Sequence, residues 1–207
     1  MSSQTVALDL AQIVVLGGFN PLIIRPDWLV EQEICREDDY RGYDFPDGEA
    51  GEGVFVFADL QWEVDYDKVV LSRRDGDSGG LAEPIKQILA KLPHTPVDAV
   101  GHNFHYSQPA EGWDGPGPQL GGLSDPSADG VKPAQTRWFA EYDFPGVRVA
   151  TSCIRAKDEG LIVWLFNHQR DCEQGTRSAL EAVGRFEDDL DLTERLLTDT
   201  YRVAEGQ

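Results

Sequence analysis

The chain has 207 residues, and its 37 Asp and Glu residues outnumber its 18 Lys and Arg residues, which gives a formal net charge of −19 at pH 7. Hydrophobic residues make up 41% of the chain, with 5 Trp and 9 Phe, so it can bury a core and is not a disordered acidic segment. Nucleic acids and anionic membranes are bound through clustered cations, and the only adjacent basic pair is Arg73-Arg74. We therefore expect no direct nucleic-acid binding and no membrane binding.

The acidity has a particular composition, because 22 Asp and 15 Glu stand beside only 5 Lys and 13 Arg. A net charge this large keeps molecules apart in solution but destabilises the compact state by self-repulsion. At molar salt the Debye length falls to about 3 Å, and most of that repulsion is screened. The composition is therefore typical of a halophilic-like protein from a salt-rich cytoplasm.

The N-terminal segment and the cysteines also indicate the cytoplasm. Residues 1–20 have no positively charged start, and the apolar run over 13–16 is too short for a signal peptide or a membrane helix. The three cysteines, Cys35, Cys153 and Cys172, are odd in number and lack metal-ligand spacing. We expect reduced thiols and a cytoplasmic location.

Short apolar runs separated by turn residues make up the first half of the chain. In order, we predict a strand over 13–16, an extended run over 22–24, a helix over 27–35, a surface loop over 36–52, and a β-hairpin with arms over 54–64 and 68–72. An amphipathic helix follows, because its apolar residues fall on one helical face: Leu81, Ile85, Ile88, Leu89 and Leu92.

The second half combines a long strand, a long loop, three further strands and a helical tail. We predict strands over 97–106, 137–144, 147–155 and 161–168 and helical structure over 176–202. A loop rich in Gly and Pro at 107–135 lies between the first two of these strands, and loops of that length are usually functional or mobile.

The order of these elements predicts the fold class. Short turns between neighbouring strands favour antiparallel pairing, with helices gathered on one face. We expect a single α+β domain over residues 1–207, with a mainly antiparallel sheet of six to seven strands, a hairpin plus a three-strand meander, and a C-terminal helical segment.

Two motifs suggest chemistry that the surrounding residues do not support. Residues 76–80 read GDSGG, the sequence around the nucleophilic serine of chymotrypsin-like proteases, but all four histidines follow Ser78, whereas in that family the histidine comes first. We interpret Asp77 or Ser78 as the N-cap of the following helix. Residues 125–130 resemble the start of a calcium loop, but Thr136 stands where a glutamate belongs, so we expect an ordinary turn.

The histidines are the best candidate catalytic groups, because histidine changes charge near neutral pH. His102 and His105 lie three residues apart on a predicted strand, so their side chains point to opposite faces and do not share a metal ion. The candidate catalytic residues are His102, His105, His168 and Asp171. The alternative, which we prefer, is that these histidines are hydrogen-bonded structural residues of the strands.

Candidate binding residues lie in turns, strands and the long loop: Asn20, Trp28, Asn103, Trp113 and Asn167. The first two also have an ordinary interpretation as a turn residue and a helix anchor. The chain has no phosphate-binding glycine loop, no paired CxxC and no HExxH. We therefore expect no cofactor and no metal site.

Four segments carry a family resemblance: GGFNPLIIRPDWL, QWEVDYDKVVLS, LPHTPVDAVGHNFHY and GLIVWLFNHQRD. The chain resembles a sporadically distributed family of small bacterial proteins with an FNP…P-x-W start and an HTPV-x-A-x-G-x-N strand. This resemblance spans most of the chain and implies an α+β fold. It supplies no activity and no catalytic residues.

Three functions follow from these observations. The first is a non-enzymatic protein-binding or assembly module, with a protein partner or a second copy docking on the sheet or on the long loop. The second is an enzyme that uses the His, Asn and Asp residues as a polar cluster. The third is an acidic mimic of nucleic acid that blocks a basic partner. We favour the first, because the motifs for catalysis are absent from the sequence.

Overall fold

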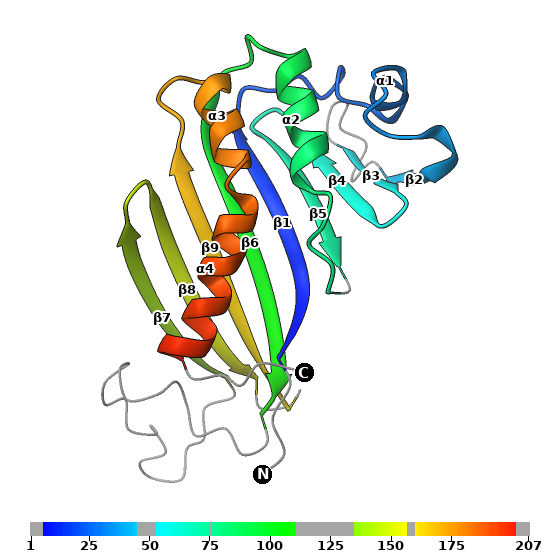
Figure 1. Cartoon of the computed structure of the whole chain (residues 1–207). Coiled ribbons are helices and arrows are strands. Elements are labelled where there is room, and N and C mark those ends of the chain that lie inside the picture. The colour runs from blue at the N-terminus through cyan, green and yellow to red at the C-terminus, as the bar shows by residue number, and fades with distance from the viewer. Residues whose placement is uncertain (1–5, 45–52, 75, 111–134, 157–159, 202–207) are drawn as a thin grey trace, which may run out of the picture.

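The computed structural model describes residues 6–44, 53–74, 76–110, 135–156 and 160–201, which form one nine-stranded antiparallel sheet with helices (Figure 1). The strands are β1 (Ala7–Gly17), β2 (Tyr40–Asp44), β3 (Gly53–Phe57), β4 (Leu60–Val64), β5 (Lys68–Arg74), β6 (Val97–Pro109), β7 (Gln135–Phe144), β8 (Val147–Ala156) and β9 (Leu161–Asp171). The helical segments are α1 (Pro26–Glu31), the 3₁₀ turn η1 (Glu37–Asp39), α2 (Ala82–Lys91), α3 (Thr176–Val183), α4 (Phe186–Arg195) and the π-helical turn η5 (Leu196–Thr200). The α+β class and the antiparallel sheet are confirmed.

The sheet order is β2-β3-β4-β5-β1-β6-β9-β8-β7, so β1, β6 and β9, which are distant in sequence, form its centre. Strand residues alternate between the two faces of a sheet. On β1, Ala11, Ile13 and Val15 are buried on one face, while Gln12 and Val14 on the other face are only half-buried. The face that buries the apolar residues holds the hydrophobic core.

Helices α2, α3 and α4 lie on the same face of the sheet, which we call the helix-covered face (Figure 1). Their buried residues include Ile85, Ile88 and Leu89 from α2 and Val183 and Phe186 from the C-terminal helices. The opposite face carries no helix of the described residues, and we call it the open face. The predicted placement of helices on one face therefore holds for these three helices.

The predicted count of six to seven strands is wrong, because two segments fold differently from their predicted form. The arm predicted over 54–64 is itself a hairpin of β3 and β4, closed at Ala58, whose φ of 52° lies in the left-handed region. The loop predicted over 36–52 contains η1 and the edge strand β2, and residues 45–52 lie outside the described part. The sequence of β2, YRGYD, has no regular apolar alternation that would reveal a strand.

Two predictions near α1 are also wrong. Residues 22–24 form a turn, because Asn20 accepts hydrogen bonds from the N–H groups of Leu22 at its side chain (3.0 Å) and of Ile23 at its carbonyl (2.9 Å). The helix predicted over 27–35 ends at Glu31, and Glu33, with a φ of 60°, reverses the chain.

The remaining elements follow the predicted order with shifted ends. The three-strand meander is β7, β8 and β9, and the helical tail divides into α3, α4 and η5. Strand β6 continues to Pro109 and β7 begins at Gln135, so both ends of the loop predicted at 107–135 are strand, and residues 111–134 lie outside the described part. Among the described residues, no helix has the length and apolar character needed to cross a membrane.

Candidate functional site

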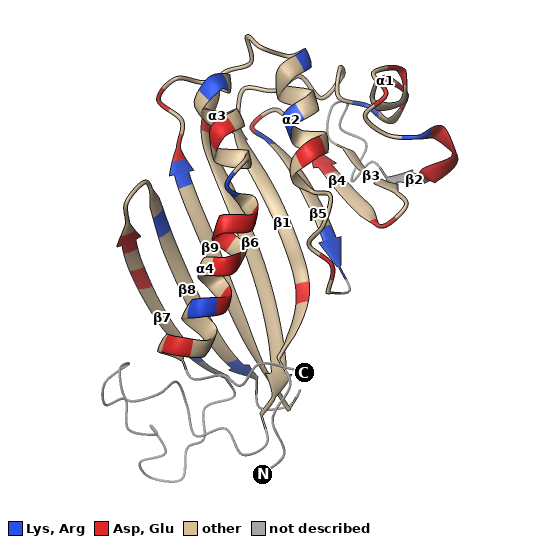
Figure 2. Ribbon diagram, in the orientation of Figure 1, with Lys and Arg blue, Asp and Glu red and all other residues tan. Residues whose placement is uncertain are grey.

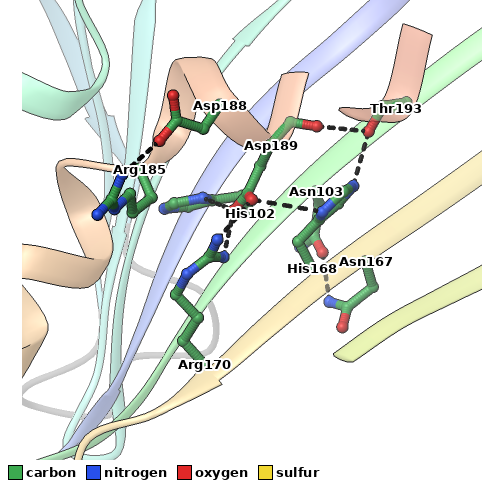
Figure 3. Close-up of polar contacts among 9 residues, drawn as sticks. All are labelled: His102, Asn103, Asn167, His168, Arg170, Arg185, Asp188, Asp189 and Thr193. Carbon is green, nitrogen blue, oxygen red and sulfur yellow. Dashed lines mark hydrogen bonds and ion pairs between the residues drawn. The ribbon is translucent and has the colours of Figure 1, made fainter. Parts of the chain in front are cut away.

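Two of the candidate histidines meet in the core beneath α4. His102 on β6 and His168 on β9 are directly opposite each other in the strand register. Both side chains point to the helix-covered face, where His102 is 1% exposed and His168 is 0% exposed. Figure 3 shows both rings beside the Asp189 carboxylate of α4.

Asp189 is the centre of this group of side chains, which we call the Asp189 cluster. Its Oδ2 lies 2.7 Å from His102 Nδ1, and Arg170 on β9 donates two hydrogen bonds of 2.5 and 2.7 Å to the two carboxylate oxygens (Figure 3). His168 Nδ1 lies 3.7 Å from Asp189 Oδ1, beyond hydrogen-bond distance. One buried carboxylate therefore joins β6 and β9 to the helix that covers them.

Asp189 and Arg170 form the charged pair of the cluster. Burial would raise the pKa of Asp189, but the hydrogen bonds from His102 and Arg170 outweigh it and hold that pKa below the usual range. Burial lowers the pKa of His102, even though its hydrogen bond to Asp189 acts in the opposite direction. The carboxylate is therefore ionised and paired with the guanidinium, and the neutral His102 ring donates its Nδ1–H.

Thr193 binds His168 to the same helix. The Thr193 hydroxyl donates to the Asp189 carbonyl oxygen (2.9 Å), and its Oγ1 lies 2.7 Å from His168 Nε2. Since a hydroxyl has one proton to donate, His168 supplies the proton of the second hydrogen bond from Nε2. The other ring nitrogens, His102 Nε2 and His168 Nδ1, are buried and have no hydrogen-bond partner among the described residues.

Aromatic rings surround the two imidazoles. The Phe186 ring meets the His102 ring edge-on at 5.2 Å between centroids, and the Phe104 ring meets the His168 ring edge-on at 5.6 Å. A general base must come within hydrogen-bond reach of its substrate. Both imidazoles are enclosed by the sheet and α4, so this arrangement serves to anchor the helix to the sheet.

Arg170 links the cluster to the surface, because its side chain is 16% exposed. It contributes to an open pocket of about 770 Å³ whose lining also includes Asp171, Arg185 and Asp188. The two guanidinium groups at this pocket are already paired, Arg170 with Asp189 and Arg185 with Asp188 at 2.9 Å. A ligand would have to compete with these carboxylates for either cation.

His105 and Asp171 do not join the other candidate catalytic residues. His105 lies on the open face, as the strand alternation predicts, and Asp171 is exposed on the same face but at the end of β9, six residues along that strand from Leu165, the residue that pairs with His105. Burial lowers the pKa of His105, while Asp9 raises it and Arg74 lowers it. The four predicted residues therefore divide between the helix-covered face, the open face and a strand end.

The open face carries a row of amide side chains across its central strands. Asn103 on β6 donates to Gln12 Oε1 on β1 (2.7 Å), and Asn167 on β9 donates to Asn103 Oδ1 (2.5 Å). The structure thus brings together two predicted binding residues, Asn103 and Asn167, and adds Gln12. Amide groups present both donors and acceptors, so this row can hydrogen-bond a polar surface placed against it.

The open face around this amide row has no carboxylate over the central part of five consecutive strands, β5, β1, β6, β9 and β8. Two acids lie toward the strand ends: Asp171, which follows Gln169 on this face of β9, and Asp9, at the bulge of β1 near His105. The registers place these side chains on the open face: Lys68, Val70, Ser72, Arg74, Leu10, Gln12, Val14, Leu16, Gly101, Asn103, His105, Ser107, Val163, Leu165, Asn167, Gln169, Arg148, Ala150, Ser152 and Ile154. Figure 2 shows acidic residues mainly on the helices and turns, with others on strands that include β7 and β1. The centre of the open face is therefore free of carboxylates, and its acids lie toward the strand ends.

The other predicted binding residues have structural roles or lie outside the described part. Asn20 is exposed and forms the turn described above. Trp28 is half-buried and packs against the core, which agrees with its interpretation as a helix anchor. Trp113 lies outside the described residues.

The GDSGG segment forms a turn, and the predicted N-cap is wrong. Asp77 Oδ1 accepts a hydrogen bond from the Gly79 N–H (2.8 Å), and Asp77 Oδ2 pairs with Arg73 (2.8 Å). The N-cap of α2 is Leu81, whose side chain makes no capping hydrogen bond. Residues 125–130 lie outside the described part, and within it no group of three His, Cys, Asp or Glu side chains is placed to hold a metal ion.

Sequence reasoning missed Asp189, Arg170 and Thr193. The helical period carries a signal for two of them, because Asp189 and Thr193 follow the buried Phe186 by three and seven residues and share its face. A carboxylate within an apolar stripe predicts a buried partner. The position of Arg170 at the end of a strand gives no comparable signal.

A search against models of known protein families and against curated proteins finds no match to this chain.

Proposed function

We propose that this protein is a non-enzymatic binding and assembly module that docks a protein partner on the open face of its sheet. One observation carries the proposal: the central part of the open face has no carboxylate across five strands in a chain with 37 Asp and Glu residues. Solvated surfaces of such a protein are acidic, whereas the centres of protein interfaces are depleted of charge. The open face has the composition of a covered surface.

The side chains of the open face indicate which kind of partner surface would complement it. The centre combines aliphatic side chains, such as Val14 and Leu165, with the amide row. Its charged residues lie toward the strand ends and are the cations Lys68, Arg74 and Arg148 and the acids Asp9 and Asp171. A complementary protein surface has an uncharged, hydrogen-bonding centre with more carboxylates than cations around it. Three cations against two acids favour such a surface over a second copy of the same face, so we propose a different protein as the occupant of this face.

The enclosure of the Asp189 cluster argues against the enzymatic alternative. Catalysis by His102 or His168 requires a substrate within hydrogen-bond reach, and both side chains are almost completely buried. His105 is accessible from the open face but has no second candidate catalytic residue beside it. An imidazole that fixes a helix to a sheet is consistent with a binding scaffold.

The distribution of carboxylates argues against mimicry of nucleic acid. A mimic presents its charges in rows that follow two phosphate backbones, whereas here they are spread over helices, turns and several strands (Figure 2). A dispersed acidic surface is the expected form of salt adaptation. We therefore assign the acidity to a salt-rich cytoplasm.

Site-specific photo-crosslinking in cells tests the docking face. A photoreactive residue at Val14 or Leu165 on the open face is compared with one at Glu187 or Asp191 on α4. We expect the open-face positions to capture one defined protein and the helix positions to capture none of it. The captured protein, once purified, should bind the wild-type chain but not the Leu165→Arg variant. Capture from α4 and not from the open face would refute the proposal.

A further inference from the structure

The two edges of the sheet are built differently. Edge strand β2 has five residues and an irregular register between Tyr40 and Gly42. A short length and an irregular register both protect an edge strand from pairing with another chain. Edge strand β7 has ten residues and an unbroken register with β8. Within the described part of the chain, no strand pairs with the outer side of β7. Among the residues that the structure describes, this edge is long, regular and unpaired.

The middle of β7 carries an exposed aromatic side chain between opposite charges. Phe139 is 58% exposed, and Arg137 and Glu141, two residues before and after it, are exposed on the same face. A protected edge strand avoids an exposed apolar side chain of this size. When a second copy runs antiparallel, the sequence Arg-x-Phe-x-Glu places Arg of one strand opposite Glu of the other, and Phe opposite Phe.

We propose that β7 pairs antiparallel with β7 of a second copy, with the two-fold axis at Phe139, so that two sheets join into one. This inference rests on the proposed assembly function but uses a different surface. In this register Arg137 lies opposite Glu141 of the partner subunit, and Phe139 lies opposite the partner subunit's Phe139. Opposite charges and paired aromatics are favourable cross-strand neighbours. The two-fold axis makes each contact occur twice.

The helix-covered side of β7 fits the same register. Trp138 then lies opposite the partner's Ala140, and Ala140 lies opposite the partner's Trp138, so a large side chain meets a small one at both positions. Trp138 and Ala140 are half-buried in the single chain, and Trp138 packs against the core. Alternation of large and small residues lets opposing side chains fill the space between them.

A register shifted by two residues is less favourable. It would place Arg137 opposite Asp143 of the partner subunit and Phe139 opposite the partner's Glu141. Asp143 already faces Arg148 of its own chain at 3.7 Å, and the aromatic side chain would lose its aromatic neighbour. No ion pair to Glu141 occurs among the described residues, so that carboxylate is available to a second copy.

The assembly brings the open faces of the two copies side by side on one continuous sheet. The net charge of −19 opposes this association by long-range repulsion. The repulsion is screened when the Debye length falls from about 10 Å at 0.1 M salt to about 3 Å at 1 M. We expect the dimer to be tighter at the higher salt concentration, because salt screens the long-range repulsion, whereas the strand pairing does not depend on long-range electrostatic attraction.

Sedimentation of the full chain from micromolar to near-millimolar concentration, at about 0.1 M and about 1 M salt, tests the inference. We expect a monomer–dimer equilibrium for the wild-type chain. Arg137→Glu or Glu141→Arg should raise the dissociation constant by about tenfold or more, because each substitution creates two like-charge pairs. The double variant Arg137→Glu/Glu141→Arg should restore the wild-type value. Thermal melting of each variant establishes that the monomer remains folded.

Three results would overturn the inference. The first is a wild-type chain that remains monomeric at both salt concentrations. The second is a dimer that the single charge reversals and Phe139→Glu leave unchanged. The third is rescue by Arg137→Asp/Asp143→Arg instead of by the first pair, which would establish the shifted register. None of these results affects the open-face crosslinks, so failure of the dimer and failure of the proposed docking face are distinguishable.

Discussion

His102 and Asp189 are 87 residues apart in the sequence, yet His102 Nδ1 lies 2.7 Å from Asp189 Oδ2 inside the core. Their side chains are 1% and 2% exposed. The carboxylate is also held by Arg170 through two hydrogen bonds. This contact joins the centre of the sheet to α4, and the first two predictions depend on it.

Asp189→Asn should destabilise the protein severely. The substitution removes the negative charge that faces Arg170, and breaking a buried ion pair by removing one partner costs about 3–5 kcal/mol. The matched control is Asp188→Asn, because Asp188 is the neighbouring residue and its side chain is 62% exposed. Urea unfolding should show a large loss for the first variant and almost none for the second. Equal losses of unfolding free energy in the two variants would mean that the burial of Asp189 does not contribute to stability.

The stability of the protein should fall with acidification in two steps. The folded-state pKa values of His102 and Asp189 are both lowered, so the unfolded chain binds more protons than the folded chain. The stabilisation is complete above the unfolded histidine value of about 6.5 and is lost as the pH falls below it, with a second loss below about 4. His105, whose pKa is also lowered, adds to the first step.

Urea unfolding from pH 8 to pH 3 at about 1 M salt, where self-repulsion is screened, measures both steps. The His102→Gln variant should lose most of the step between pH 7 and pH 5, since glutamine does not titrate. The variant His105→Asn separates the contribution of the open face. A wild-type unfolding free energy that is constant between pH 7 and pH 5 would contradict the assignment of a neutral His102.

Gly17→Ala should be poorly tolerated, although the residue looks like ordinary punctuation between a strand and a turn. A Cβ at Gly17 would lie 2.1 Å from the Pro96 carbonyl oxygen, which is a backbone atom and cannot move aside freely. We expect a loss of about 3 kcal/mol or more in the unfolding free energy. Gly18→Ala is the control, because the nearest atom to its added Cβ is a Pro96 side-chain carbon at 3.7 Å. Similar losses for both variants would contradict this explanation.

Salt should stabilise the monomer mainly through screening. The melting temperature of a variant that does not dimerise, such as Phe139→Glu, should rise steeply between about 0.01 M and 0.5 M NaCl, as the Debye length falls from about 30 Å toward 3 Å. The rise should then flatten, because the net charge of −19 is by then screened. A melting temperature that is independent of salt in this range would contradict salt adaptation of the surface.

The cysteine thiols should react slowly with alkylating reagents. Burial raises the pKa of Cys35 to about 12, with a further contribution from Asp39, and burial also raises the pKa of Cys153 and of Cys172. Because the thiolate is the nucleophile, little of it is present at neutral pH. Mass spectrometry after brief iodoacetamide treatment should find the native protein largely unmodified and the urea-unfolded protein fully modified. Rapid modification of Cys35 in the native protein would contradict its assigned environment.

The periodicity of the sequence determined much of the secondary structure. Apolar residues at helical spacing predicted α2, and apolar runs bounded by Pro-Gly and Gly predicted the strands of the meander. Periodicity failed at β2, whose sequence YRGYD has no regular apolar alternation, and at α1, where Glu33 adopts a left-handed conformation. Local spacing reports which face of an element is buried, and it carries little information about elements that bury almost nothing.

The sequence by itself also established the excess of carboxylates and placed His102 and His105 on opposite faces of one strand, because composition and side-chain alternation are properties of the chain. Only the tertiary structure decided which carboxylate His102 meets. Any of the 37 acidic residues was a candidate, and the sheet order β1-β6-β9 with α4 above it selects Asp189. That choice depends on contacts between residues far apart in sequence, for which local periodicity carries no signal. The same is true of the carboxylate-free centre of the open face, which exists only when five strands are laid side by side.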